Sequence, residues 1–232
     1  MKIIKKIFFL ILTYFLVQNA FARGLQGPYL GTEINYTKAR DIGKEYDLDG
    51  TWNFWKQDIK PEGIGIGFKI GNNWIMNDRF LLGIEANYKK NNARDTVFQY
   101  KVSDGELCLD GGNDCTFKTK LDQSLSFIGK AGYLLNEKTV IYALGGYTTA
   151  RLERKVYDGW DQRRWMDYNK WQDGWTLGGG FEYMLIDSLS LKTEYRFTDL
   201  GKYRYYTPAY EGQYEDQKYN QKEINFGINY YF

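Results

Sequence analysis

The sequence contains no histidine. Ser-His-Asp triads, Cys-His pairs, most zinc sites and histidine-ligated haem need an imidazole ring, so the sequence argues against all of them. Proline occurs only three times and cysteine twice in 232 residues. Beyond the N-terminal segment, no apolar run approaches the roughly 20 residues that a membrane-spanning helix needs. If the chain lies in a membrane, it therefore crosses the membrane as strands.

Aromatic residues and glycine are abundant instead, with 21 Tyr, 14 Phe, 7 Trp and 25 Gly. Aromatic side chains suit the pleated surface of a sheet, so this composition favours an all-β fold. The formal charge of +2 includes three lysines near the N-terminus, and without them the 31 basic residues fall to 28, against 29 acidic ones. This balance does not indicate a nucleic-acid partner.

The N-terminal segment has the three parts of a secretory signal peptide. Three lysines flank the start of an apolar run over Ile7–Val17, and Ala20 and Ala22 supply the small residues that a signal peptidase reads. An uncleaved anchor helix is the alternative, but the run is shorter than the roughly 20 residues such a helix needs. We predict a signal peptide over residues 1–22, cleaved after Ala22, and one exported domain over residues 23–232.

Eight segments of the exported domain alternate apolar and polar residues with period two, as strands with two different faces do. In the clearest of them, Leu189–Phe197, the polar positions are Ser190, Lys192, Glu194 and Arg196. Each segment approaches the roughly 9–11 residues that a tilted membrane-crossing strand requires. The other seven predicted strands are Tyr29–Tyr36, Gly63–Gly71, Leu82–Tyr88, Leu125–Tyr133, Thr139–Tyr147, Trp175–Tyr183 and Ile224–Phe232.

The connections between these strands alternate between short and long. All short connections would fall on one rim of a closed sheet and all long ones on the other, as in bacterial outer-membrane barrels. We therefore predict an eight-stranded antiparallel transmembrane β-barrel with short periplasmic turns and four long extracellular loops. The predicted long loops are Thr37–Glu62, Lys89–Leu121, Thr148–Asp173 and Asp199–Gln221.

The alternation alone does not say which face of the sheet is outside. A secreted lipocalin-like carrier would bury the apolar face, and Gly50-Thr51-Trp52 matches a short motif of such carriers. Two features favour apolar side chains facing lipid instead: the polar face is rich in glycine, which suits a narrow interior, and its charges are nearly balanced. These charges predict a plugged, stabilising lumen, with a small weakly conducting porin as the alternative. The predicted lumen charge network is Glu33, Lys69, Glu85, Lys130, Glu182, Lys192, Glu194 and Arg196.

Three segments near the C-terminus resemble a known family. The last strand, Ile224–Phe232, ends in phenylalanine with apolar residues at alternate positions, and Gly174–Tyr183 and Lys192–Gly201 resemble the two strands before it. The resemblance is to small outer-membrane β-barrel surface proteins, which include the outer membrane protein A barrel, the opacity-type adhesins and porin-family surface antigens. It implies a location in the outer membrane of a Gram-negative bacterium and recognition of the last strand by the barrel assembly machinery. It also implies surface contact or adhesion through extracellular loops, and no enzymatic activity.

Two cysteines lie in the second predicted loop. Export places them in an oxidising compartment, and Gly111 and Gly112 can form the reversal between them, so we predict a disulfide between Cys108 and Cys115. A metal site is the alternative, but two thiols without histidine make a poor one. We expect no metal, no cofactor and no catalytic residue.

The third predicted loop combines aromatic and basic residues. Trp and Arg are common in binding hot spots, and they also settle at lipid headgroups, where Arg meets phosphates of lipopolysaccharide. Both interpretations stay open, so the expected partners are outer-membrane lipid and lipopolysaccharide or a host or cell-surface ligand. The candidate contact residues are Arg151, Arg154, Trp160, Arg163, Arg164, Trp165 and Trp171.

Overall fold

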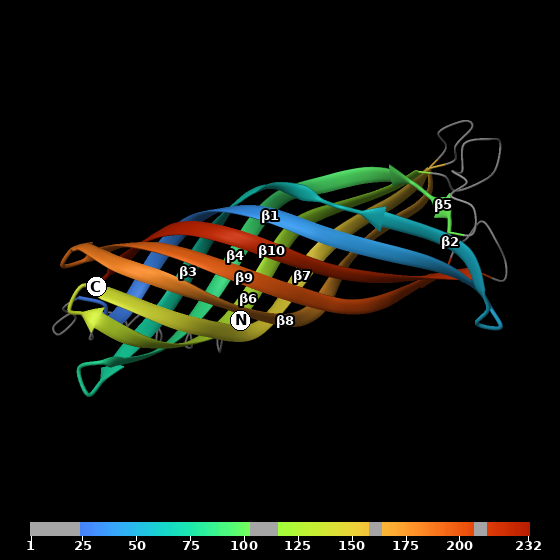
Figure 1. Ribbon diagram of the computed structural model, residues 1–232. Coiled ribbons are helices and arrows are strands. Elements are labelled where there is room, and N and C mark those ends of the chain that lie inside the picture. The colour runs from blue at the N-terminus through green and yellow to red at the C-terminus, as the bar shows by residue number, and fades with distance from the viewer. Residues whose placement is uncertain (1–23, 103–115, 158–163, 207–212) are drawn as a thin grey trace, which may run out of the picture.

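A computed structural model describes residues 24–102, 116–157, 164–206 and 213–232. The chain forms an elongated cylinder of strands (Figure 1). Within the described ranges, no helix has the length and apolar character to cross a membrane. The predicted signal peptide and the Cys108–Cys115 disulfide lie outside the described residues and stay predictions.

Eight long antiparallel strands form the wall, and each pairs with its neighbours in chain order. The last strand also pairs with the first, over a register that runs from Tyr29–Tyr231 to Asp47–Gln213, so the sheet closes on itself. The predicted eight-stranded antiparallel architecture is therefore confirmed. The wall strands are β1 (Gly27–Asp47), β3 (Glu62–Met76), β4 (Phe80–Phe98), β6 (Thr116–Asn136), β7 (Thr139–Tyr157), β8 (Arg164–Ile186), β9 (Leu189–Tyr206) and β10 (Gln213–Tyr231).

Short turns close one end of the cylinder. They join β3 to β4, β6 to β7 and β8 to β9, and the end of β10 lies beside the start of β1. In the first turn Asn77 and Asp78 have φ values of 51° and 56°, the left-handed conformation that two-residue hairpin turns require and that these two residue types tolerate. We call this the turn end of the barrel.

At the other end the strands run much further than the sequence predicted. The wall strands contain 15 to 23 residues, whereas a membrane crossing needs about 9–11. For example, β7 continues ten positions beyond the predicted end at Tyr147, and β8 begins at Arg164 rather than Trp175. Two short strands, β2 (Trp52–Ile59) and β5 (Tyr100–Lys101), add to the sheet in this region. The predicted long loops were wrong over these stretches, since most of each is strand.

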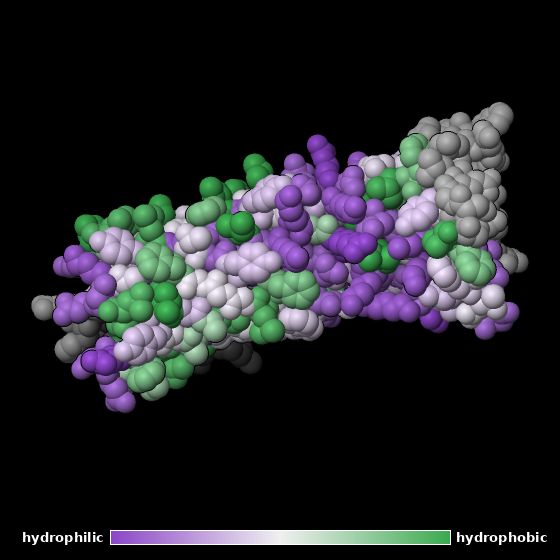
Figure 2. Space-filling model, in the orientation of Figure 1, coloured by the Kyte–Doolittle hydropathy of each residue, from purple (hydrophilic) through white to green (hydrophobic). Residues whose placement is uncertain are grey.

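The outer surface near the turn end is a belt of exposed apolar side chains (Figure 2). Ile64, Phe68 and Ile84 are each more than half exposed, although they are large and apolar. Water does not tolerate so large an apolar surface, whereas lipid does, so the belt marks the membrane half of the barrel. At the upper edge of the belt, Tyr36 and Tyr147 donate hydrogen bonds to the carboxylates of Glu62 and Asp173. Tyrosines with an apolar ring and a polar partner are typical of a membrane boundary.

Beyond that boundary the outer face becomes polar and the inner face contains apolar as well as polar side chains, and we call this part the extracellular half. Inward-facing Leu121 and Leu152 are fully buried here, while Lys120, Glu153 and Lys155 point outward. The buried residues form two apolar layers inside the barrel. One contains Ala39, Ala93, Leu121, Ala150, Leu152, Leu200 and Tyr219, and the next contains Ile59, Phe117 and Val156.

Candidate functional site

The lumen of the membrane half is filled by a buried network of ion pairs. Glu85 lies at one centre of it, with the side-chain nitrogens of Lys192 and Arg196 each 2.8 Å from a carboxylate oxygen and Lys130 at 3.3 Å. Glu194 also binds Arg196, at 2.6 Å, and Lys192, at 2.8 Å. All these side chains are at most 1% exposed, so each charge depends on its partners rather than on water.

A second centre of the network is Glu33. Its carboxylate oxygens lie 2.8 Å from Lys69 and 3.3 Å from Lys89, and Lys89 in turn lies 3.0 Å from Glu223. Glu182, the remaining acid predicted for the lumen, is also buried, but its described contacts are hydrogen bonds from Ser190, Asn229 and Tyr231. The structure thus places all eight predicted lumen residues on inward positions of the wall.

Sequence reasoning missed two members of this network. Lys89 lies two positions after Asn87 and four after Glu85, so it faces the lumen as they do. Glu223 lies two positions before the inward-facing Asn225 and also faces the lumen. Both fell outside the predicted strands, because the strand boundaries were set where the apolar alternation ended. The period-two pattern, continued by one more step, would have included them.

Apolar layers close the lumen on both sides of the ion pairs. At the turn end, Leu81, Val140 and Met184 pack with the rings of Tyr29 and Tyr231. Glycines make room for the large polar groups next to this layer: a Cβ at Gly180 would lie 2.7 Å from Cζ of Tyr142 and from Cγ of Glu194, closer than side-chain atoms approach. The interior is therefore packed with side chains, as expected for eight strands.

A buried ion pair also lies inside the extracellular half. Arg154 donates to both carboxylate oxygens of Asp41, at 2.7 and 3.1 Å, and contacts the hydroxyl of Tyr205. Burial alone would lower the pKa of the Arg154 guanidinium, but the Asp41 carboxylate outweighs burial and holds that pKa above its ordinary value. Burial raises the pKa of Tyr205 to about 12. Arg154 was predicted as a surface-loop contact; that placement was wrong, since Arg154 points into the barrel and is 2% exposed.

The other candidate contact residues divide into two groups. Arg151 and Trp171 lie on the outward face of β7 and β8, in the wall rather than in a loop. Arg164 and Trp165 begin β8, again in the wall, and their side chains are not described. Trp160 and Arg163 lie outside the described residues.

The extracellular end carries aromatic rings in contact with one another. Tyr46 of β1 stacks on Tyr214 of β10 with ring centroids 5.4 Å apart, and Tyr206 of β9 lies 6.3 Å from Tyr214. Tyr46 is also paired across the sheet with Trp52 of β2, whose ring lies 5.0 Å from that of Phe54. We call these five residues the aromatic rim. Phe54 and Tyr206 are 50% and 60% exposed, so part of the rim faces solvent.

Three cations lie over the faces of these rings. Lys44 is 4.8 Å from the ring centroid of Trp52, Lys202 is 5.9 Å from that of Tyr46, and Arg204 is 3.8 Å from that of Tyr214. The side-chain hydrogen bond to Asp216 is the main reason that the pKa of Arg204 is raised. Cation–aromatic stacking of this kind orders side chains that would otherwise move freely. The sequence did not predict this arrangement, because the rings come from four different strands.

In the ranges that the structure describes, no group of three or more metal-ligating side chains comes together. The chemistry available at the rim is therefore stacking, hydrogen bonding and charge pairing.

Comparison with known proteins agrees with this architecture. A model of the family described as outer membrane protein beta-barrel domain matches residues 7–232. This chain belongs to that family. The protein accordingly lies in the outer membrane of a Gram-negative bacterium. The predicted outer-membrane location is confirmed, and the alternative of a secreted lipocalin-like carrier was wrong, because family membership and the exposed apolar belt place the apolar face in lipid.

Outer-membrane proteins of Brucella are among the relatives that match most of the chain. The 31 kDa outer-membrane immunogenic protein of Brucella melitensis is 28% identical over 89% of this chain and 83% of its own length. The 25 kDa outer-membrane immunogenic protein of Brucella abortus is 26% identical over 93% of this chain and 81% of its own length.

Solved structures share the fold at much lower identity. The outer membrane protease OmpT of Escherichia coli is 10% identical with a TM-score of 0.56, over 91% of this chain and 99% of that one. The outer membrane protein OprG of Pseudomonas aeruginosa is 12% identical with a TM-score of 0.53, over 90% and 98%. At these identities the likeness concerns the fold alone.

Proposed function

We propose that this protein is a structural and interaction protein of the outer membrane, which makes surface contacts through its extracellular half and is neither an enzyme nor a diffusion pore. The observation that carries the proposal is the contrast between a filled interior and an exposed aromatic rim. Within the described ranges, ion pairs and apolar layers fill the lumen and leave no room for a ligand or a channel there, so we assign the function to the outer surface.

The aromatic rim has the composition of a protein contact surface. Trp, Tyr and Arg dominate binding hot spots because they offer large rigid area and directional hydrogen bonds. Here Tyr206 and Phe54 are exposed, and Arg204 stacks on Tyr214 beside them. These residues lie on strands or directly beside them, so little conformational entropy is lost when a partner binds.

The names of the relatives support exposure outside the cell. Both Brucella proteins are called outer-membrane immunogenic proteins, and a protein recognised by the immune system has accessible surface. The lack of histidine in this chain supports a non-enzymatic role. The fold shared with a protease does not argue against it, because one fold hosts many functions.

Adhesion of cells that display the protein tests this proposal. The rim variant W52A/R204A/Y206A should reduce attachment to cultured mammalian cells several-fold. A second variant that replaces Trp160, Arg163, Arg164 and Trp165 by alanine tests the third loop in the same assay. K138A, in an exposed turn at the opposite end, is the matched control. Unchanged attachment of both surface variants, at equal display, would contradict a contact role.

A small weakly conducting porin is the second candidate, because charged side chains line the interior. Recording in a planar lipid bilayer separates the two. The filled lumen predicts no steady conductance, whereas stable open channels in most insertions would favour the porin.

We also infer that the C-terminal strand is the part recognised by the barrel assembly machinery. The amide of Phe232 donates to the carbonyl of Pro28 at the start of β1, and the amide of Tyr231 donates to the carbonyl of Ser188 in the turn between β8 and β9. Deletion of Phe232 should lower the amount of folded protein in the outer membrane while the urea resistance of the folded fraction stays nearly unchanged.

A further inference from the structure

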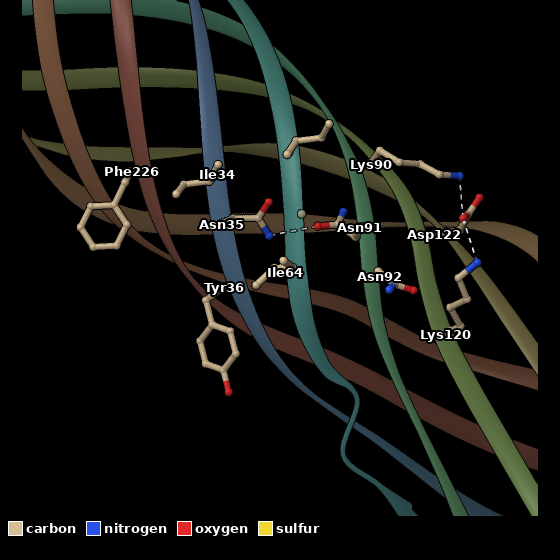
Figure 3. Close-up of a pocket in the computed structure, with 12 residues that line it drawn as sticks. Ile34, Asn35, Tyr36, Ile64, Lys90, Asn91, Asn92, Lys120, Asp122 and Phe226 are labelled. Carbon is tan, nitrogen blue, oxygen red and sulfur yellow. Dashed lines mark hydrogen bonds and ion pairs between the residues drawn. The ribbon is translucent and has the colours of Figure 1, made fainter.

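A groove lies on the outer surface where the apolar belt meets the charged residues above it. It has a volume of about 640 Å³ and extends across strands β10, β1, β3, β4 and β6. Its apolar side is formed by Ile34, Ile64, Ile66 and Phe226. Figure 3 shows Lys90, Lys120 and Asp122 gathered on the other side, away from Phe226 and Ile34.

The strand register explains why the groove has an apolar and a cationic side. Phe226, Ile34, Ile66 and Lys90 are direct cross-strand neighbours, in that order, from β10 to β4. Strands in a membrane barrel are tilted by about 35–45°, so a row at right angles to them rises through the membrane boundary. The row therefore begins in the apolar belt and ends among charged residues.

Irregular pairing shapes the cationic side. The register shifts by one residue between Lys90 and Ala93 on β4 and between Leu121 and Gln123 on β6. A bulge of this kind turns a side chain in a new direction. Here it allows one carboxylate oxygen of Asp122 to accept hydrogen bonds from Lys90, at 2.7 Å, and from Lys120, at 3.2 Å.

Two ammonium groups thus share one carboxylate, which leaves a positive charge in excess at the groove. The Lys90 side chain is 52% exposed, so its remaining hydrogen-bond donors reach outward. Each lysine ammonium has three donors and no acceptor. The pair is held in place before any ligand arrives.

Two more lysines lie at the same boundary nearby. Lys38 and Lys222 are direct cross-strand partners on β1 and β10, and only Lys38 has a described carboxylate partner, Glu62 at 3.5 Å. Like charges directly opposite each other destabilise a sheet unless an anion lies between them. Arg94, which is also exposed, lies between Glu62 and Lys120 in the register, so the five cations and two acids of this side leave three positive charges in excess.

On the opposite side of the barrel, the outward residues at the same membrane boundary have a different charge. The outward residues above Tyr147 and Trp175 on β8 and β9 include Asp173 and Asp199. Asp199 lies 3.7 Å from Lys218, so a phosphate would meet a more nearly balanced charge there than at the groove.

We propose that the groove binds a phosphorylated glycolipid of the outer leaflet, lipopolysaccharide, with a phosphate at Lys90 and Lys120 and an acyl chain along Ile34, Ile66 and Phe226. The phosphates of a membrane lie where its hydrocarbon ends, which is the level of these lysines. This site is separate from the aromatic rim, so either can fail without the other.

Binding of fluorescent lipopolysaccharide to the detergent-folded protein tests the site. The variant K90Q/K120Q/D122N removes all three charges and leaves no unpaired carboxylate, and its Kd should be at least about tenfold weaker. K155Q, an outward lysine on β7, is the matched control and should bind within about twofold of the wild type. Dephosphorylated lipopolysaccharide should bind the wild type about as weakly as the intact lipid binds the triple variant.

Three outcomes would overturn the site. The first is a triple variant that binds as well as the wild type, and the second is equal binding of the dephosphorylated lipid. The third is full displacement by inorganic phosphate, which would mean a site for soluble anions rather than lipid. If the triple variant fails to show the heat-dependent gel shift of a folded barrel, K90Q alone keeps the Lys120–Asp122 pair and should bind about threefold more weakly.

Discussion

The membrane half and the extracellular half of this barrel are built from the same strands, but their outer faces have opposite polarity. On β1, the outward residues Ile34 and Tyr36 give way to Lys38 and Arg40, while the inward sequence passes from Glu33 to Ala39. The pairing of β1 with β10 continues without a register shift from Tyr29 to Asp47, through both halves. The medium outside the wall decides which face is apolar, because lipid accepts apolar side chains and water does not.

The difference also extends to how each interior is stabilised. The membrane half has its polar residues inside and relies on a network in which Glu85 and Glu33 each serve two or more cations. The extracellular half combines two apolar clusters with buried polar groups, among them the Asp41–Arg154 ion pair and the hydrogen-bonded Gln57, Glu215 and Gln217. The first half is thus sensitive to loss of a charge and the second to loss of apolar volume.

The largest expected effect is the loss of a central carboxylate in the membrane half. Glu85→Gln leaves Lys130, Lys192 and Arg196 without a shared counter-charge, which should lower the free energy of unfolding by about 3–5 kcal/mol. Urea unfolding of the protein in lipid vesicles measures this. Glu137→Gln, in an exposed turn, is the control, and a loss below about 1 kcal/mol for Glu85→Gln would show that the network does not stabilise the lumen.

A cavity in the core of the extracellular half should have the next largest effect. The Leu152 side chain points into the barrel and is 1% exposed, so Leu152→Ala should lower the free energy of unfolding by about 2–5 kcal/mol. Ile84→Ala on the belt should lose less, because lipid chains refill the space. Urea unfolding in vesicles compares the two, and equal losses would argue against a packed extracellular core.

An arginine placed on the outer surface should destabilise the membrane half much more than the extracellular half. Ile84→Arg places a guanidinium in the belt and should cost about 2–4 kcal/mol near the bilayer centre. Glu153→Arg on the outward face of β7 places the same group in water, directly opposite Lys120, and should change stability by less than about 1 kcal/mol. Similar stability of the two folded variants would mean that the belt does not face lipid.

The smallest expected effect concerns a surface ion pair of the extracellular half. Arg40 donates two hydrogen bonds to Asp58, at 2.9 and 2.6 Å, and these bonds are the main reason that the pKa of Asp58 is lowered. The pair should contribute about 0.2–1 kcal/mol. Because the folded pKa is the lower one, this contribution is present above the ordinary aspartate pKa and is lost as the pH falls through the folded value.

Comparison of the wild type with Asp58→Asn in acid and at neutral pH measures this contribution. The difference between the two proteins should shrink in acid and in high salt. A difference that persists at low pH would assign the effect to something other than charge.

The membrane half was predictable from the sequence, and the extracellular half was not. Alternation in segments such as Leu189–Phe197 located all eight strands and the eight lumen charges, because a lipid-facing strand has two strongly different faces. The same period continues through Leu152, Arg154 and Val156, which face inward. The outward residues between them, Glu153 and Lys155, are charged. This stretch was predicted to be a loop, because its outward face is charged and therefore lacks the apolar alternation of a lipid-facing strand.

Contacts between distant strands explain the other omissions. The aromatic rim joins Tyr46 and Trp52, on the consecutive strands β1 and β2, to Tyr214 on the last strand, which is far from both in the chain. The groove depends on one-residue shifts beside Asp122 that no local pattern indicates. The two-residue alternation shows which face of the sheet a side chain occupies, but not which residue lies opposite it on the next strand. The sequence therefore predicted the inward and outward faces, but neither the aromatic rim nor the groove.

The reversal of polarity along the barrel can be tested directly with spin labels in lipid vesicles. Ile84→Cys and Glu153→Cys are labelled separately in a protein whose Cys108 and Cys115 are replaced by serine. We expect the label at position 84 to be relaxed by oxygen dissolved in lipid and protected from a water-soluble nickel chelate. The label at position 153 should behave in the opposite way. Equal access of the nickel chelate to both labels would contradict the reversal.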